Sequence, residues 1–258
     1  GVGQGMMRRE LACFFEAVRF FTRLPVPAWV GHSAEALNHA ARYFPAVGLL
    51  VGAIGALVYV AALQLWPHAI AVVLSMAATI YVTGAFHEDG LSDTVDGLGG
   101  GWDKLRILEI MKDSRVGSYG VVAMVLALLG KFLLLNTLAP ALVPPVLVAG
   151  HAVSRFCAVS LLATMDYVRE DLLSKAKPLA TKLPLGALLV ALVFALLPLI
   201  GLPVDKALFA CLLACLPTVW MAMKFRRWLG GYTGDCLGAT QQLSEIGFYL
   251  GILASWPR

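Results

Sequence analysis

The sequence predicts an all-α fold, a polytopic bundle of helices that crosses a membrane several times. Hydrophobic residues make up 59% of the 258 positions and charged residues only 14%, against about 25% charged residues in an average soluble domain. Too few polar residues remain to cover a water-exposed surface, so the surface is expected to face lipid. The apolar residues form continuous runs, and a spanning run must satisfy its own backbone hydrogen bonds, which favours helices over alternating strands.

The N-terminal region, residues 6–42, is predicted to lie at the membrane surface. The stretch from Glu10 to Leu24 is apolar on one face, carries Arg19 and Arg23, and ends before Pro25. This pattern is typical of an amphipathic helix that lies in the interface and does not cross the membrane.

The rest of the chain, residues 43–258, is predicted to form the helical bundle, so that residues 1–258 make a single membrane domain. Residues 1–5 read as a remnant of an expression vector and are left out of the prediction. Seven apolar runs are long enough to span a membrane. They are Tyr43–Trp66, Ala69–Phe86, Val116–Leu138, Ala141–Met165, Leu183–Leu202, Asp205–Met223 and Cys236–Trp256.

The distribution of positive charge predicts which side of the membrane each loop occupies. With the N-terminus inside the cell and seven spans, most of the 20 lysine and arginine residues fall in four cytoplasmic parts. These are the N-terminal region up to Arg42 and segments 87–115, 166–182 and 224–235. Cytoplasmic loops are enriched in lysine and arginine, so the acid-rich segment 87–115 is predicted to face the cytoplasm.

The five cysteines are expected to be packing residues. Their number is odd and their spacing is scattered, which argues against a disulfide framework or a metal site. Cys211 and Cys215 lie one helical turn apart inside an apolar run, where cysteine behaves as a small hydrophobic residue. The others are Cys13, Cys157 and Cys236.

The segment 87–115 carries the candidate catalytic and metal-binding residues. Asp89, Asp93 and Asp96 follow the spacing i, i+4, i+7, which places three carboxylates on one face of a helix. Three like charges near a membrane repel each other, so a cation is expected among them.

A second acid pair, Glu109 and Asp113, follows a predicted break at the glycines between Gly97 and Gly101. Two acid-bearing helices joined by a flexible turn would face each other and enclose a divalent ion. Carboxylate ligands favour Mg²⁺, or Mn²⁺, over zinc. The alternative is a solvated loop in which the acids pair with nearby lysine and arginine, and this is the preferred interpretation for Asp103.

Further residues are candidates for substrate binding. Arg115 is expected to hold a diphosphate or to lie at the membrane interface as an ordinary surface cation. His87 is a candidate general base, ligand or helix-end hydrogen-bonding group. Four residues are predicted to lie in or beside apolar spans, where ionisable groups are usually functional. They are Lys131, His151, Arg155 and Glu245.

The glycine-rich stretch 230–238 carries Thr233 and Asp235, which are further substrate-binding candidates. Its backbone amides are suited to cradling a phosphate. A tight turn into the last span explains the same glycines, and both interpretations stay open at this point.

Three separated motifs resemble the cobalamin synthase family, the adenosylcobinamide-GDP ribazoletransferases of bacteria. The resemblance covers nearly the whole chain, and the motifs stand in the order expected of that family. They are FTRLPVP at 21–27, HEDGLSDTVDG at 87–97 with EIMKDSRVGSYG at 109–120, and GGYTGDCLGA at 230–239. One departure is Glu88, where an apolar residue is expected between the histidine and the aspartate.

The resemblance implies the last assembly step of vitamin B12. In that reaction α-ribazole, or its 5′-phosphate, displaces GMP from adenosylcobinamide-GDP, and Mg²⁺ is the expected cofactor. It also implies a multi-pass protein of the bacterial cytoplasmic (inner) membrane, in contact with lipid and with its active site facing the cytoplasm. No nucleic-acid partner is expected, and association into a homo-oligomer is left open.

A looser resemblance links the same segment to the CDP-alcohol phosphotransferases, which use two metal ions. Asp93, Asp96 and Gly97 together with Glu109 and Asp113 are similar to that signature. The chain departs from it by lacking an Ala-Arg pair after the glycine and by having glutamate where aspartate is usual. By position in that signature, Asp113 is the candidate proton acceptor.

Two other functions are compatible with acids at membrane depth. An intramembrane prenyltransferase also binds diphosphates through aspartates and Mg²⁺, but its two motifs are typically far apart in sequence. An ion-coupled transporter would use the acids as cation ligands, but the sequence shows no convincing internal repeat. A transferase acting on the GDP-activated corrinoid is therefore the preferred interpretation.

Overall fold

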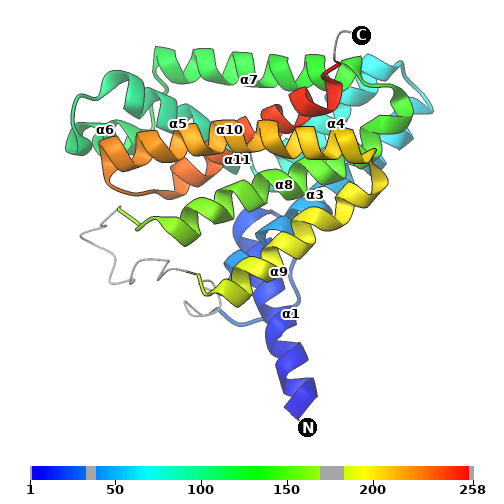
Figure 1. Ribbon diagram of the computed structural model, residues 1–258, viewed down its shortest axis with the longest axis horizontal. Coiled ribbons are helices and arrows are strands. Elements are labelled where there is room, and N and C mark those ends of the chain that lie inside the picture. Colours follow the sequence, from blue (N-terminus) through cyan, green and yellow to red (C-terminus); the bar gives the residue numbers. More distant parts are fainter. Residues whose placement is uncertain (1, 33–38, 169–182, 256–258) are drawn as a thin grey trace.

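The computed structural model describes residues 2–32, 39–168 and 183–255. Within these ranges the chain forms helices joined by short turns, with one isolated β-bridge (Figure 1). The all-α, polytopic membrane class predicted from the sequence is confirmed. The helices are α1 (Val2–Phe21), α3 (Phe44–Leu63), α4 (His68–Thr83), α5 (Phe86–Gly100), α6 (Lys104–Lys112), α7 (Ser118–Thr137), α8 (Val143–Thr164), α9 (Leu185–Leu196), α10 (Val204–Leu229) and α11 (Gly234–Leu253).

The number of spans differs from the seven expected. Among the described residues, four helical segments are long and apolar enough to cross a membrane, or five if the bent pair α4 and α5 is one span. Helix α9, with the short turn that follows it, is apolar but shorter. The four segments are Ala41–Leu63, Ser118–Thr137, Pro140–Thr164 and Val204–Leu229.

The predicted last span, Cys236–Trp256, corresponds to α11, which is not among these apolar segments. Helix α11 carries Gln241, Gln242 and Glu245, and all three side chains are buried. Most of this helix is therefore enclosed by other helices, although Leu250 is exposed. The prediction that this segment is a further span is not confirmed.

A sharp bend separates α4 from α5. The two helix axes differ by 84°, and the bend is made by Gly84 and Ala85, whose φ angles are +63° and +57°. A positive φ costs an alanine about 1–3 kcal/mol, so the surrounding structure must hold this turn in place. The bend starts α5 inside the protein and presents Glu88 and Asp89 in its first turn, where the helix dipole favours negative charge.

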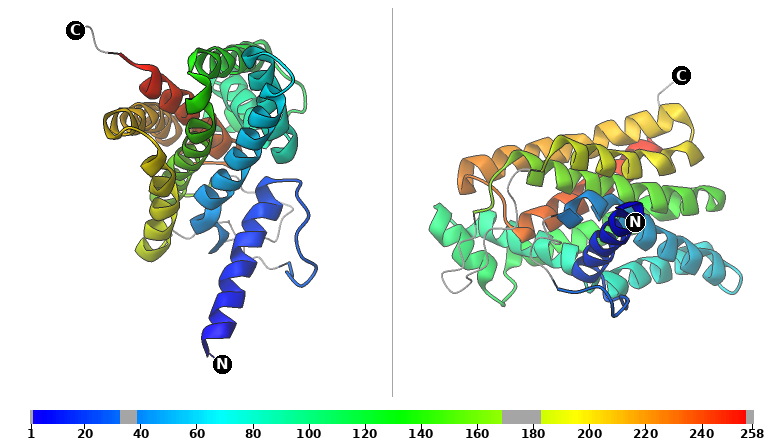
Figure 2. Two further views of the ribbon diagram at one scale, coloured as in Figure 1. Left: turned by 90° about the vertical axis from the view of Figure 1, so that its right-hand side faces the viewer. Right: turned by 90° about the horizontal axis from the view of Figure 1, so that it is seen from below.

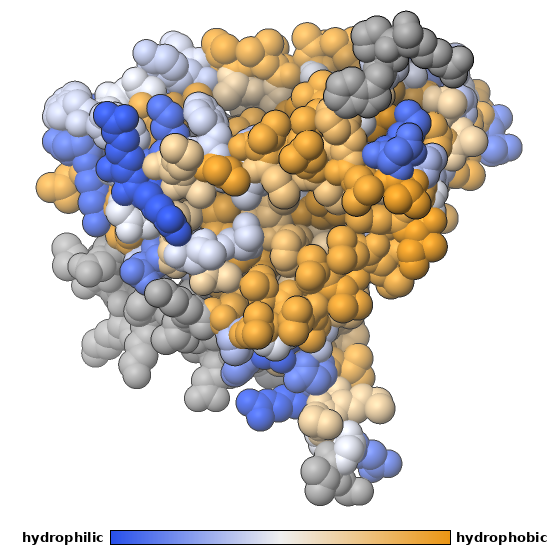
Figure 3. Space-filling view, viewed as in Figure 1, coloured by the Kyte–Doolittle hydropathy of each residue, from blue (hydrophilic) through white to orange (hydrophobic). Residues whose placement is uncertain are grey.

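The core of the molecule lies around α8 and α11, and the apolar exterior lies on α7, α9 and α10. In the most apolar stretch of each segment, 78% of the residues are buried in α8, compared with 22% in α7 and 28% in α10. The exposed leucines and valines of α10 and α9 contribute to the hydrophobic surface in Figure 3. In the same view, hydrophilic side chains gather at the end of the molecule that contains α5, α6 and the end of α10.

The predicted N-terminal helix is present but is longer than expected at its start. It runs from Val2 to Phe21 and projects from the bundle (Figures 1 and 2). Its last turns pack on the core through Ala17, Val18 and Phe21. Cys13, Cys157 and Cys236 are buried, Cys211 is half-buried and Cys215 is exposed.

Candidate active site

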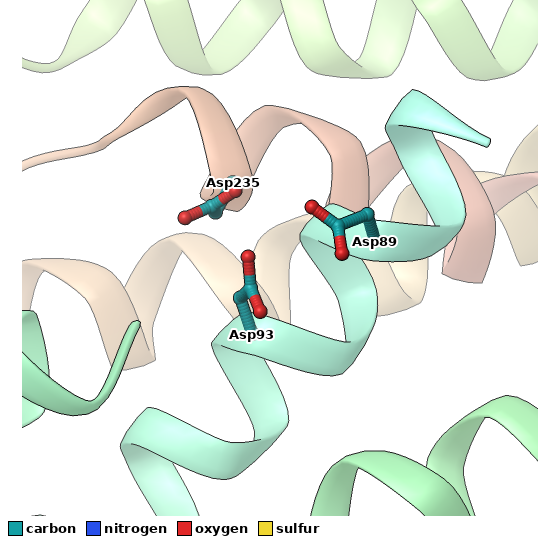
Figure 4. A group of neighbouring side chains, drawn as sticks. All are labelled: Asp89, Asp93 and Asp235. Atoms are coloured by element: carbon teal, nitrogen blue, oxygen red, sulfur yellow. The ribbon is translucent and has the colours of Figure 1, made fainter. Parts of the chain in front are cut away.

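Three carboxylates from two helices meet at one end of the bundle. They belong to Asp89 and Asp93 of α5 and to Asp235 at the start of α11, and one oxygen from each lies within 4.8 Å of the others. Figure 4 shows the three side chains around the space between the two helices. Asp89 is exposed and the other two are half-buried, so the group is open to solvent. The described part of the chain contains no other such group.

Two glycines allow α5 and α11 to approach closely enough to form this acid cluster. A Cβ atom added to Gly90 would lie 2.9 Å from the Asp235 carbonyl oxygen and 3.2 Å from the Gly238 Cα atom. A Cβ atom on Gly238 would in turn lie 3.2 Å from the backbone of His87. Backbone atoms cannot move aside as a flexible side chain can, so the helix crossing depends on these glycines.

The start of α11 is fixed by Thr233. Its side chain is fully buried, and its hydroxyl oxygen accepts a hydrogen bond from the backbone N–H of Cys236 at 3.3 Å. This N-cap satisfies one of the free amides of the first turn. Asp235 lies in that turn. In this structure Thr233 therefore positions Asp235, and direct contact between Thr233 and substrate stays a prediction.

Asp96 lies further along α5 than the acid cluster and has a different set of partners. Its two carboxylate oxygens accept hydrogen bonds from the backbone N–H groups of Gly117, at 2.8 Å, and Gly120, at 2.7 Å. Asp96 thus caps the N-terminus of α7 from a neighbouring helix. A Cβ atom on either glycine would lie within 2.6 Å of one carboxylate oxygen, so both positions favour glycine.

We expect the Asp96→Ala variant to lose about 1.5–3 kcal/mol of stability, the range for hydrogen bonds to a charged group. The matched variant Asp96→Asn keeps one carbonyl acceptor and is expected to lose less. Thermal unfolding in detergent measures both. Equal stability of Asp96→Ala and the unchanged protein would contradict the capping role.

The predicted acid pair on the second helix does not join the cluster. Helix α6 packs on α5 through Ile107 and Met111, which lie against Gly97. Glu109 lies on the opposite face, its side chain is 70% exposed, and it forms an ion pair with Arg106 at 2.9 Å. The acid-bearing face of α6 therefore does not face that of α5, contrary to the prediction, because the apolar face of α6 forms the contact with α5. The glycine break also comes later than expected, since α5 continues to Gly100.

Asp113 and Arg115 form a close pair between α6 and α7. The Arg115 guanidinium donates to both carboxylate oxygens, with its Nη2 atom 2.8 Å from Oδ2. Hydrogen bonds from this side chain hold the pKa of Asp113 at about 2, below its ordinary value of 3.8. Such a carboxylate stays ionised at neutral pH but is a weak proton acceptor. Both residues line an open cleft together with Asp96, and the Arg115 side chain is 88% exposed.

Lys131 is buried and is paired inside the protein. Its Nζ atom donates to the side-chain oxygen of Gln242 at 2.7 Å and lies 3.9 Å from a carboxylate oxygen of Glu88. Glu88, the residue that departs from the family pattern, is 6% exposed. The positive charge of Lys131 therefore balances this unusual buried acid, and Lys131 is not among the residues that surround the acid cluster.

The other buried charged residues continue the same polar network through the core. Glu245 accepts hydrogen bonds from Tyr249 at 2.7 Å and Gln241 at 2.9 Å, and it lies 4.0 Å from His151. Arg155 donates to the His151 carbonyl oxygen at 3.0 Å, and its Nη1 atom lies 3.0 Å from the ring Nδ1 atom.

Sequence analysis missed the glutamines and the tyrosine of this network. Gln241 links Glu245 to Ser154 of α8, and Gln242 links Lys131 to Glu88. Two adjacent glutamines inside an apolar run are the signal that identifies such a network, because buried amides must find partners.

The acid cluster has the ligand chemistry of a divalent-cation site. Carboxylate oxygens are the ligands that Mg²⁺ and Mn²⁺ prefer, and magnesium is typically held by a few carboxylates together with water and substrate phosphates. Partial exposure of the three aspartates leaves room for those additional ligands. The fold and this group define a class of protein: a polytopic helical membrane protein with an aspartate-rich site at one end of the bundle.

Comparison with known proteins assigns the family within that class. Residues 13–253 match the family model described as cobalamin-5-phosphate synthase. The chain belongs to this family.

Curated relatives agree over nearly the full length of the chain. A protein of Shewanella woodyi named adenosylcobinamide-GDP ribazoletransferase is 47% identical over 251 residues, covering 96% of this chain and 98% of its own. Proteins of the same name from Polaromonas sp. JS666 and Shewanella frigidimarina are 47% and 48% identical, covering 93% and 95% of this chain and 95% of their own lengths. No solved structure matches the chain.

Proposed function

We propose that this chain joins α-ribazole, or its 5′-phosphate, to adenosylcobinamide-GDP and releases GMP. A hydroxyl group of the ribazole forms a bond to the phosphorus on the cobinamide side, and the bond from that phosphorus to GMP breaks. The product is adenosylcobalamin or its phosphate. The observation that carries the proposal is the meeting of Asp89, Asp93 and Asp235 in a chain of the cobalamin-5-phosphate synthase family.

Asp89, Asp93 and Asp235 are proposed to hold Mg²⁺. The fit rests on three carboxylate oxygens that lie within 4.8 Å of one another at a solvent-accessible position. A divalent ion at that place would neutralise negative charge on the diphosphate and on the leaving GMP. Asp235 thus replaces Asp96 in the predicted triad, because Asp96 is already hydrogen-bonded to the start of α7.

Arg115 is proposed to bind a phosphate of the GDP portion. Its side chain is exposed and lines the open cleft that begins about one helical turn along α5 from Asp93. A guanidinium can hold phosphate oxygens through two parallel hydrogen bonds. Contact with a phosphate would compete with the Asp113 pair, and the release of Asp113 would let its pKa rise from about 2 towards its ordinary value. Only in that released state is Asp113 suited to accept the proton of the ribazole hydroxyl.

The active site is proposed to face the cytoplasm of a bacterial cell from its inner membrane. Arg115 lies just before α7, and Lys224, Arg226 and Arg227 lie in the last turns of α10, a few residues before Asp235 in the chain. Positive charge of this kind is typical of cytoplasmic loop ends. Water-soluble nucleotide substrates would then reach the site directly.

The proposal is tested by mixing the purified protein in detergent or lipid with adenosylcobinamide-GDP, α-ribazole and Mg²⁺. We expect GMP to be released in a one-to-one ratio with the new corrinoid, and both to disappear when EDTA removes the divalent ion. An ion-coupled transporter would release no GMP. A prenyltransferase would use a prenyl diphosphate and leave the corrinoid unchanged, so either result would refute the proposed reaction.

A further inference from the structure

A pocket of about 280 Å³, the α7–α10 pocket, lies between the start of α7 and the last turns of α10. Its volume approaches that of pockets that hold small organic ligands, about 300 Å³ or more. Residues of α5 and α11 supply its apolar wall, among them Val95, Leu98 and Leu243. In Figures 1 and 2, α11 runs between α7 and α10, and these two helices have at most marginal contact with each other.

The mouth of the α7–α10 pocket combines aromatic rings with a cation. Tyr119 of α7 and Trp220 and Trp228 of α10 belong to its wall, and all three side chains are exposed. Lys224 lies between the two tryptophans on the same face of α10, because the three residues follow the spacing i, i+4, i+8. Its ammonium group lies 5.6 Å from the centre of the Trp220 ring. Tryptophan and tyrosine together with lysine are typical of the level at which lipid headgroups meet the hydrocarbon core.

The exposed side chains on both helices become aliphatic away from this mouth. On α10, Leu216 and Leu212 lie one and two turns before the first pocket tryptophan, and both are exposed. On α7, Val122 and Leu126 follow the pocket tyrosine and are exposed as well. A hydrocarbon chain that begins in the pocket would therefore continue along an apolar surface.

The end of α10 carries positive charge without a matching acid. Lys224, Arg226 and Arg227 lie in its last turns, and the helix has no acidic residue after Asp205. Within the described ranges, none of these three cations forms an ion pair with a carboxylate. The guanidinium of Arg227 instead lies over the ring of Trp228, at 5.3 Å. Basic pockets between membrane helices are suited to anionic lipid headgroups.

We propose that the α7–α10 pocket binds an anionic phospholipid of the surrounding membrane. The headgroup phosphate binds Lys224 at the mouth, and one acyl chain fills the apolar interior beside Val95 and Leu98. A soluble phosphate compound fits less well, because the wall and the surface that leads from it are mostly apolar. The inference goes beyond the proposed transferase reaction and does not depend on it.

The bound lipid would pack against the helix that carries the acid cluster. Val95 lies two positions after Asp93 on α5, and two positions correspond to a rotation of about 200°. The pocket and the acid cluster therefore lie on opposite sides of this helix. Lipid binding at this place would support α5 from behind without entering the active site.

The test counts bound lipids by native mass spectrometry of the purified protein in a neutral detergent. Phosphatidylglycerol, which is anionic, is compared with phosphatidylethanolamine, which has no net charge, and both carry identical acyl chains. We expect a single saturable site that prefers phosphatidylglycerol. Lys224→Met should weaken the binding of this lipid about fivefold, the contribution of one lysine near a lipid surface. Equal binding of the two lipids by the unchanged protein would overturn the inference.

The matched control is Arg226→Met, which makes the same change in charge outside the pocket wall. Arg226 donates a hydrogen bond to the Thr164 carbonyl oxygen of α8 at 3.3 Å. We expect this variant to bind phosphatidylglycerol as tightly as the unchanged protein. An equal loss in Arg226→Met and Lys224→Met would overturn the inference, since the lipid would then respond to the total charge of the helix end.

A second variant tests the seat of the acyl chain without changing any charge. Val95→Phe adds a ring to the wall of the pocket, so it should weaken the binding of phosphatidylglycerol, while thermal unfolding in detergent checks the fold. Glycerol 3-phosphate, which has the phosphate but no acyl chain, should not displace the lipid. Displacement by this compound, or unchanged affinity in a folded Val95→Phe variant, would show a site for a soluble phosphate and overturn the inference.

Discussion

Asp93→Asn and Asp235→Asn should each lower turnover by about 100-fold or more while leaving the protein folded. Each change removes one negative charge from a group of three carboxylates whose oxygens lie within 4.8 Å. Stabilisation of transition-state charge by a bound metal is worth several kcal/mol, and each 1.36 kcal/mol is a factor of ten in rate. GMP release over a range of Mg²⁺ concentrations measures both the rate and the half-saturating concentration, which should rise in both variants.

Asp103→Asn is the matched control for these variants. Asp103 caps α6 by accepting a hydrogen bond from the Arg106 amide at 2.9 Å, and asparagine is an equally good N-cap. We expect turnover in this variant to stay within about twofold of that of the unchanged protein. Normal turnover and normal Mg²⁺ dependence in Asp235→Asn would remove this residue from the site.

Gly90→Ala should also lower turnover, although no charge or hydrogen bond is changed. The new methyl group would lie 2.9 Å from the Asp235 carbonyl oxygen and 3.2 Å from the Gly238 Cα atom. Overpacking of this kind typically costs about 1–3 kcal/mol, and here it would separate α5 from α11. Asp235 would then move away from Asp89 and Asp93. We expect at least about a tenfold loss of turnover, equivalent to 1.4 kcal/mol, and weaker activation by Mg²⁺.

The matched control for this substitution is Gly130→Ala on α7, where an added Cβ atom has no neighbour within 4 Å. Alanine favours a helix over glycine by about 1 kcal/mol, so this variant should be as active as the unchanged protein and as stable or more so. Thermal unfolding in detergent distinguishes a displaced helix from a general loss of the fold. Full activity of Gly90→Ala would show that the helix crossing tolerates a wider separation.

The membrane class and most helices could be predicted from the sequence because apolar runs and helix-ending glycines and prolines are local signals. The position of α11 could not be predicted in this way. Whether a helix faces lipid or other helices depends on its neighbours, and here the polar residues Gln241, Gln242 and Glu245 find partners on α5, α7 and α8. The same limit applies to the 84° bend at Gly84 and Ala85, where tertiary packing holds an alanine at positive φ.

The candidate site was only partly predictable, because some of its geometry lies within one helix and the rest depends on neighbouring helices. The spacing of Asp89 and Asp93 is a property of one helix, and it placed both side chains on a common face correctly. Periodicity also placed Asp96 on that face, but only the start of α7 determines where its carboxylate binds. Asp235 could be selected as an acid in a glycine-rich stretch, yet its place beside α5 depends on a helix crossing that no local pattern encodes.

The acid cluster joins Asp89 and Asp93 to Asp235, which the ribosome adds to the chain much later. Among the described helices α11 is synthesised after all the others, and it supplies the third carboxylate, one glycine of the helix crossing and both glutamines of the polar network. Until it arrives, Glu88 and Lys131 lack their shared partner Gln242, and Asp89 and Asp93 face no third acid. Chains that stop before α11 therefore lack the third carboxylate and the glutamine partners of the buried charges, and we expect such incomplete products of synthesis to be inactive.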